Sequence, residues 1–173
     1  IIHFFLNFKS SAVGSIALNV NTGSYNTAVG STALAANTTA EENTAIGYEA
    51  LNDNTTGAKN TALGFRALDL CTTGSENTAV GGDALGGLLT GSYNTAVGRS
   101  ALNDNTGSYN VGVGVEALTN NTSATHNVAV GFRALNTVTT TGDNVAIGNY
   151  ALYSNASTRN VGVGYSAGYN TTG

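Results

Sequence analysis

Few side chains in this chain could carry out acid–base or nucleophilic chemistry. The 173 residues include two histidines, one cysteine and ten carboxylate side chains, whereas catalysis needs paired titratable groups in a pocket. His3 lies in an apolar stretch. His126 stands directly before a short segment that recurs along the chain. At the same position before the other copies stands Tyr, Glu, Lys, Asp or Arg, and such tolerance of polar residues is typical of a solvated turn. We therefore expect no catalytic residues and no enzyme.

Metal, cofactor and nucleic-acid sites are not indicated either. Cys71 is the single cysteine, which excludes a disulfide framework and a cysteine metal cluster. No Asp recurs at the fixed positions that calcium-binding solenoids need, and Glu41, Glu42, Asp53 and Asp104 fall in expected turns. The six Lys and Arg residues are dispersed, so there is no basic patch for phosphate groups. We expect no metal, no cofactor and no nucleic-acid partner.

The composition is unusual for a soluble domain. Charged residues make up 9% of the chain, against about 25% typically, and there are 23 glycines and no Pro, Met or Trp. No apolar run approaches the roughly 20 residues needed to cross a bilayer, so no membrane span is expected. The dense apolar stretch Ile1–Phe8 could be a signal-peptide remnant. We favour an N-terminal strand over residues 1–9 that caps the fold or pairs with another subunit.

The remainder, residues 10–173, is an internal repeat. A five-residue motif, Asn-(Thr/Val)-(Ala/Gly)-(Val/Ile/Leu)-Gly, recurs every 16 or 17 residues. A degenerate copy at Ser10–Gly14 brings the total to ten units, and an Ala-Leu pair follows most motifs. The motif Asn residues are expected to form an Asn ladder along the stack, and they are Asn26, Asn43, Asn60, Asn77, Asn94, Asn110, Asn127, Asn144 and Asn160.

A unit of this length is too short for a helix pair or a βαβ crossover. It suits one coil of an all-β, parallel β-solenoid with two short strands and two turns, in which Gly and Asn supply the positive φ of the corners. About ten coils stacked at the strand spacing of about 4.8 Å make a rod of roughly 48 Å.

Strand alternation suggests which residues face the core. The fourth motif position is always Val, Ile or Leu, and we expect it to point inward. The second position, Thr27 to Thr95 and then Val111 to Val161, shares that face and is expected to be semi-buried. The Val column comprises Val29, Ile46, Leu63, Val80, Val97, Val113, Val130, Ile147 and Val163.

The third motif position never exceeds a methyl group in size. If it faces outward by alternation, the size limit indicates close approach of a second chain, and hence a side-by-side oligomer. If the coil is narrow, the position turns inward instead; both interpretations stay open. The Ala/Gly column comprises Ala28, Ala45, Ala62, Ala79, Ala96, Gly112, Ala129, Ala146 and Gly162.

Two further columns are expected inside the coil. The Leu of each Ala-Leu pair must be buried. Three residues later comes a column of Asn in which Cys71, Leu88 and Val138 substitute. Stacked Asn side chains can form hydrogen-bonded ladders, and Cys71 would then be a small buried hydrophobe. This second Asn column comprises Asn21, Asn37, Asn54, Asn105, Asn121 and Asn155.

A variable column follows the motif glycine. Its larger members could contact carbohydrate or another chain, although filling a corner of the coil is the simpler interpretation. They are Tyr48, Phe65, Arg99, Val115, Phe132 and Tyr165.

The segments NTAVG, NVAIG and NVGVG, each followed by an Ala-containing segment, resemble the head repeats of YadA-type trimeric autotransporter adhesins. They are similar as well to NTA-x-G repeats of phage tail-fibre and bacterial surface proteins. The resemblance covers about residues 10–173. It implies a left-handed β-roll with three chains side by side, exposed on the cell surface and binding host matrix. The unit here is longer than the adhesin unit, and no heptad stalk or anchor is visible.

These observations predict a structural or adhesive segment of an extracellular, cell-surface or virion fibre. Its partners would be copies of itself, side by side or end to end. Tyr169–Gly173 stops within a repeat without a polar cap, so either the chain continues in the native protein or a neighbour supplies the next coil. A host receptor or glycan is a further expected partner. The alternative function is a glycan-binding tail-fibre-like solenoid. Ice binding ranks lower, because the Thr column turns to Val and its parity points it inward.

Overall fold

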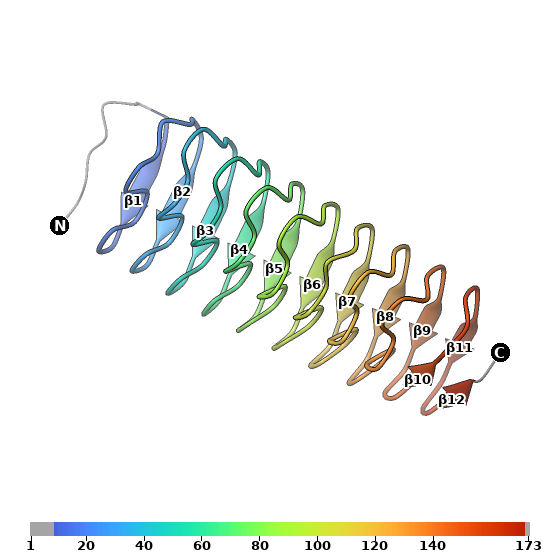
Figure 1. The fold of residues 1–173 in the computed structure, drawn as a ribbon. Helices are drawn as coiled ribbons and strands as arrows, with labels where there is room; N and C mark the ends of the chain where they lie inside the picture. The colour runs from blue at the N-terminus through green and yellow to red at the C-terminus, as the bar shows by residue number, and fades with distance from the viewer. Residues whose placement is uncertain (1–8, 172–173) are drawn as a thin grey trace.

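A computed structural model describes residues 9–171. The expected strand at residues 1–9 therefore lies outside the described residues, apart from Lys9. Ten three-residue strands form one parallel sheet in chain order (Figure 1). They are β1 (Ser11–Val13), β2 (Thr27–Val29), β3 (Thr44–Ile46), β4 (Thr61–Leu63), β5 (Thr78–Val80), β6 (Thr95–Val97), β7 (Val111–Val113), β8 (Val128–Val130), β9 (Val145–Ile147) and β11 (Val161–Val163).

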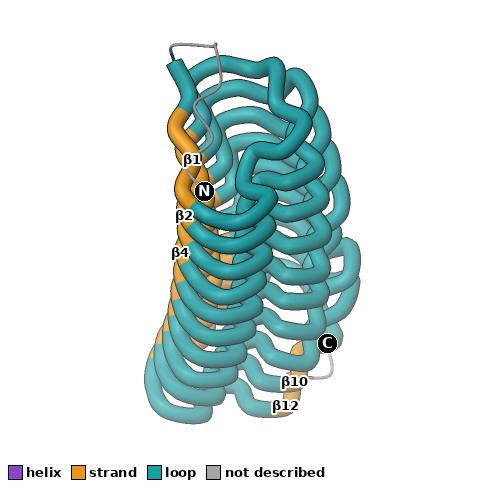
Figure 2. The backbone as a smooth tube through the Cα atoms, turned by 90° about the vertical axis from the view of Figure 1, so that its left-hand side faces the viewer, coloured by secondary structure: helices purple, strands orange, loops and turns teal. Residues whose placement is uncertain are grey.

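Each motif lies directly on the one before. Thr27 pairs with Thr44 and Ala28 with Ala45, and the same register continues along the sheet to the Val161–Val145 pair. The strands line up along one side of the coil and the rest of each coil is turns and loops (Figure 2). The predicted parallel β-solenoid is therefore confirmed.

The expected second strand in every coil is wrong. The Ala-Leu segment is a run of turns, and within residues 9–171 only β10 (Ser154–Asn155) and β12 (Asn170–Thr171) pair outside the main sheet. The physical reason is the backbone of the Leu column, Leu18 to Leu152, which has φ between 46° and 53°. This left-handed conformation interrupts any extended segment. Turn hydrogen bonds connect the coils instead, such as Leu51 N to Ala67 O at 2.9 Å.

The corners take positive φ from glycine, as predicted, but not from Asn. The motif glycine has φ between 125° and 143° along the rod. At Gly47 a Cβ would stand 2.2 Å from the carbonyl oxygen of Gly64 in the next coil. The remaining positive φ angles fall on the Leu column, on the residue two before each Leu, and on the residue before each motif Asn, for example Leu51, Glu49 and Glu42.

The core is built from the Ala/Gly column and the Ala-Leu pairs. Ala28 and Leu34 have no exposed surface, and neither do their equivalents along the middle of the rod. The assignment of the Ala/Gly column to chain–chain contact is therefore wrong, and the narrow-coil interpretation is confirmed. The Leu column sets the size limit: a Cβ on Gly112 would lie 3.2 Å from Leu102 Cγ. The corrected column is Ala28, Ala45, Ala62, Ala79, Ala96, Gly112, Ala129, Ala146 and Gly162.

The assignment of the Val column to the core is also wrong. Because each strand has three residues and its central residue points inward, the two flanking residues both point outward. Val29 is 40% exposed and Ile147 43%. The second motif position shares this outward face. The residues that are not core are Val29, Ile46, Leu63, Val80, Val97, Val113, Val130, Ile147 and Val163.

The motif Asn column forms the predicted ladder. Each side-chain Oδ1 accepts a hydrogen bond from the backbone N–H of the motif Asn in the next coil, at 2.9–3.0 Å, as Asn26 does from Asn43. The side-chain nitrogen of the same residues donates a second bond, as Asn43 Nδ2 does to the carbonyl oxygen of Gly57 at 2.9 Å. Each amide thereby ties its own coil to its neighbours and satisfies buried backbone groups.

The second Asn column points inward, as predicted, and its ladder is interrupted. Asn54 Nδ2 donates to Asn37 Oδ1 at 2.8 Å, and Asn121 Nδ2 donates to Asn105 Oδ1 at 2.7 Å. Cys71, Leu88 and Val138 are fully buried in the same column. Among the described residues, Asn54 Oδ1 is the buried side-chain atom without a hydrogen-bond partner, because Cys71 stands where an amide donor would be.

Candidate interaction surface

The most distinctive surface of the rod is the outward side of the main sheet. We call it the outer sheet face and define it as the first and third residues of strands β1 to β9 and β11. These positions hold Val, Ile, Leu, Thr and one Ser, and no charged residue. Exposure ranges from 37% at Val97 to 74% at Val161 among its exposed apolar members. An uncharged surface with a continuous column of partly exposed apolar side chains is a candidate interaction site.

The face changes composition along its length. Its first-residue column is Thr in β2 to β6 and Val in β7 to β9 and β11. The third-residue column stays apolar throughout. The part near β1 therefore combines hydroxyls with aliphatic groups, and the part near β11 is aliphatic alone.

One edge of the outer sheet face carries the residue that precedes each motif Asn. Tyr93, Tyr109 and His126 stack along the rod here, with ring centroids 4.9 Å and 5.1 Å apart and planes within 6°. Lys9 Nζ lies 4.8 Å from the Tyr25 ring centroid. His126 is exposed, and its Nδ1 lies 3.0 Å from Thr125 Oγ1.

The opposite edge carries the column after the motif glycine. Tyr48 and Phe65 stack at 5.5 Å, and Phe132 packs edge-on against Tyr150 at 5.2 Å. These rings point away from the rod rather than into a corner: Tyr48 is 48% and Phe65 52% exposed. Corner filling does not describe them, and their role as contact residues stays a prediction.

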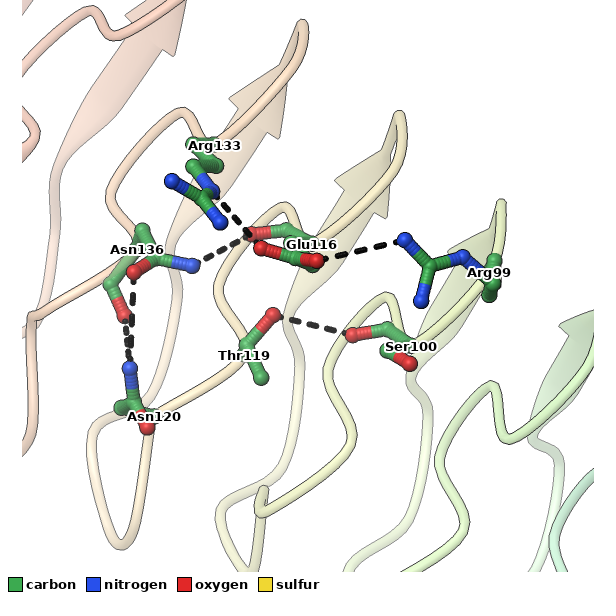
Figure 3. Close-up of polar contacts among 7 residues, drawn as sticks. All are labelled: Arg99, Ser100, Glu116, Thr119, Asn120, Arg133 and Asn136. Carbon is green, nitrogen blue, oxygen red and sulfur yellow. Dashed lines mark hydrogen bonds and ion pairs between the residues drawn. The ribbon is translucent and has the colours of Figure 1, made fainter.

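Beyond that edge, ion pairs link successive coils. Glu116 lies between Arg99 and Arg133 of the neighbouring coils, at 3.3 Å and 2.7 Å (Figure 3). The Glu116 carbonyl oxygen accepts a bond from Asn136 Nδ2 at 2.8 Å. The pair with Glu116 raises the pKa of Arg133. Because each arginine is already engaged with a carboxylate, this group is a cross-coil tie rather than an anion site.

A second charged group surrounds a shallow hollow of about 320 Å³ lined by Arg66, Asp69, Leu70, Asp83, Gly86, Gly87, Asn103 and Asp104. Burial, followed by the nearby carboxylates of Glu49 and Asp53, raises the pKa of Asp69 to about 6. Arg66 bonds Glu49 at 2.7 Å and lies 3.6 Å from Asp69. The hollow is open, and its arginine is already paired with carboxylates.

The remaining candidates for chemistry are dispersed. Glu41 and Glu42 are exposed in a turn, and Asp53 and Asp104 lie in turns of separate coils. Cys71 is buried, and burial raises the pKa of its thiol to about 11. Within residues 9–171 no three His, Cys, Asp or Glu side chains are grouped so that they could hold a metal ion, and no helix could cross a membrane.

Sequence reasoning missed the outer sheet face, because it placed both of its columns inward. A signal for it was present: across ten units, neither column contains a charged residue. Comparison with known proteins adds nothing to the geometry, since no family model, curated protein or solved structure matches this chain.

Proposed function

We propose that this chain is a structural segment of an extracellular or cell-surface fibre and associates side by side with copies of itself through the outer sheet face. One observation carries the proposal: an uncharged, half-buried to exposed surface with an unbroken apolar column runs along all ten coils. Leaving it in water is costly, at roughly 25 cal/mol per Å² of apolar area. A second copy offers a surface of the same length, spacing and chemistry.

The size of the face supports a copy as the occupant. Ten strands of three residues cover about 48 Å by about 10 Å, or about 480 Å². The rings of Tyr93, Tyr109 and His126, stacked along the edge that precedes the motif Asn, widen it toward the roughly 800 Å² per partner of a stable interface. Because the coils repeat at a constant spacing, two copies can match rows of side chains along their whole length.

The experiment is a change of charge on this face. Purified wild-type protein is expected to elute as an oligomer in size-exclusion chromatography with light scattering. The double variant Val97→Glu, Val130→Glu places two carboxylates on the outer sheet face and should run as the 17.4 kDa single chain, because desolvating unpaired charge in an interface is costly.

A matched control puts the same charge elsewhere. Thr73 and Thr140 are exposed in turns away from the sheet, so Thr73→Glu, Thr140→Glu should leave the oligomer intact. A wild-type protein that is a single chain at every concentration, or equal dissociation by both double variants, would refute the proposal. Electron micrographs of the oligomer should show straight rods.

The outward direction of the Thr column favours one other function, ice binding. Thr27, Thr44, Thr61, Thr78 and Thr95 lie in register on successive strands of the outer sheet face, whereas the sequence parity had placed them inward. An oligomer that buries this row could not bind ice. Thermal hysteresis of the Val97→Glu, Val130→Glu single chain, compared with a Thr61→Lys version of it, tests this function. Equal activity in the two would dismiss it.

A further inference from the structure

Five aromatic residues gather on the turn side of the coils that contain β8, β9 and β11. Tyr150 is their centre, and its ring centroid lies 5.2–6.3 Å from those of the four others. We call the group the aromatic cluster: Phe132, Tyr150, Tyr153, Tyr165 and Tyr169. It borders the outer sheet face, because Phe132 and Tyr165 follow the motif glycines at one edge of that face, but none of its residues is among the strand residues that define the face.

The geometry of the aromatic cluster differs from that of the other aromatic residues. Elsewhere rings stack nearly parallel, as Tyr48 and Phe65 do at 12°, and cover each other's faces. Tyr150 instead meets Phe132 at 89° and Tyr165 at 79°. Tyr153 and Tyr169 stack at 10° with centroids 4.9 Å apart. The edge-on contacts of Tyr150 leave more of the Phe132 and Tyr165 ring faces uncovered, so these rings form tilted apolar plates beside the stacked pair.

Two of the five residues are exposed, and Phe132, Tyr150 and Tyr153 are half-buried. Tyr165 is 78% and Tyr169 41% exposed. In the same column as Tyr165, Tyr48 and Phe65 have coils on both sides and are still 48% and 52% exposed. The column therefore points away from the rod wherever it carries a large side chain.

The charges beside the aromatic cluster cancel. Arg133 lies over the Phe132 ring, 5.1 Å from its centroid, and bonds Glu116 at 2.7 Å. A ligand for this site must therefore be uncharged, must offer a flat apolar side to the rings, and must carry hydroxyls for the phenols. A sugar ring has these three properties. From this geometry we propose that the aromatic cluster binds a neutral polysaccharide, along the chain rather than at its end, because the surface is open.

Affinity gel electrophoresis tests the site with soluble probes: a β-glucan, a mannan, a xylan and a dextran in the gel. The wild-type chain should be retarded by at least one of them. The variant Tyr150→Ser, Tyr153→Asn, Tyr165→Ser should lose that retardation. Its new residues already occupy the same columns at Ser100, Asn103 and Ser31, so the coil should fold unchanged, and its circular dichroism spectrum verifies this.

The control is Tyr48→Ser, Phe65→Ser, which removes a stacked pair from the same column as Tyr165 and should retain full retardation. Absence of retardation by all four polysaccharides would overturn the site, and so would equal losses in the two variants. If the aromatic cluster bound a protein instead of a saccharide, none of the four polysaccharides would retard the chain. Light scattering on the same samples shows whether self-association changes, so the two proposals fail separately.

Discussion

At the scale of single residues, buried amides hold the coils in register. Asn121 Nδ2 donates to Asn105 Oδ1 at 2.7 Å and to Ala124 O at 3.1 Å, and its Oδ1 accepts from Ala124 N at 3.0 Å. A buried polar group that loses its partner costs about 1–3 kcal/mol. The second Asn column is therefore a polar part of the core whose members must be satisfied.

We expect Asn121→Val to lower the free energy of unfolding by about 2 kcal/mol, because the Ala124 N–H would be left unpaired in the core. Val fits the column by size, as Val138 shows. Urea unfolding followed by circular dichroism measures the change. Cys71→Ala is the comparison: its thiol makes one long contact, 3.6 Å to Gly74 O, so it should cost about 1 kcal/mol or less. Equal costs would contradict the ladder argument.

Asp69 predicts a dependence of stability on pH. Burial, then Glu49 and Asp53, raises its pKa in the folded state to about 6 from 3.8. The folded protein therefore favours the protonated carboxyl, and stability is lost as the pH rises from about 4 through 6.

Asp69→Asn should remove that loss, and Asn already occupies the same column at Asn52 and Asn103. We expect the variant to be more stable than the wild type by about 1 kcal/mol at pH 7, after allowance for solvent screening, and by almost nothing at pH 4. Unfolding free energies at the two pH values decide this. A difference that is the same at both would show that the carboxyl does not titrate as described.

At the scale of the element, the corner after each strand depends on glycine. Gly47 has φ +141°, and a Cβ there would be 2.2 Å from Gly64 O. We expect Gly47→Ala to cost at least about 3 kcal/mol, because backbone strain and a backbone clash combine. At Gly82, the nearest atom to an added Cβ is Phe65 O at 3.9 Å, so Gly82→Ala should change stability by less than about 1 kcal/mol. Thermal unfolding of the two variants distinguishes them, and similar melting temperatures would refute the role of the corner.

Periodicity made the stacking of the coils predictable, whereas the direction of the side chains was not. In a strand of three residues, Thr27 and Val29 share a face, and an apolar pair at that spacing looks the same whether it faces the core or the solvent. The small Ala28 between them could be read either as a core residue or as a contact residue. The left-handed backbone of Leu34 (φ 50°) carries no sequence signal, since Leu rarely adopts it. The outer sheet face was missed for this reason.

At the scale of the whole molecule, each coil contacts its immediate neighbours, so the rod should accept the removal of one complete unit. Deleting residues 78–94, 17 residues, places Thr95 on Thr61 and Ala96 on Ala62 in the register that β4 and β5 now share. It also removes Leu88 from the second Asn column. No Asn–Asn hydrogen bond of that column is broken, because Leu88 lies between Cys71 and Asn105. The circular dichroism spectrum should persist, and small-angle scattering should show a rod shorter by about 4.8 Å.

Deleting residues 78–85 is the control, because half a unit moves every later column out of line. That variant should lose the native spectrum. If both deletions were tolerated equally, register between coils would not be what determines the fold.

The change from Thr to Val along the first-residue column makes the two ends of the outer sheet face chemically different. A second rod that packs on this face can therefore distinguish the two directions. If two rods lie against each other pointing the same way, hydroxyls meet hydroxyls and aliphatic groups meet aliphatic groups. Reversing one of them sets Val145 of one copy opposite the Thr rows of the other, and leaves those hydroxyls without hydrogen-bonding partners. A bundle formed through this surface should therefore be polar, with all its members growing in one direction.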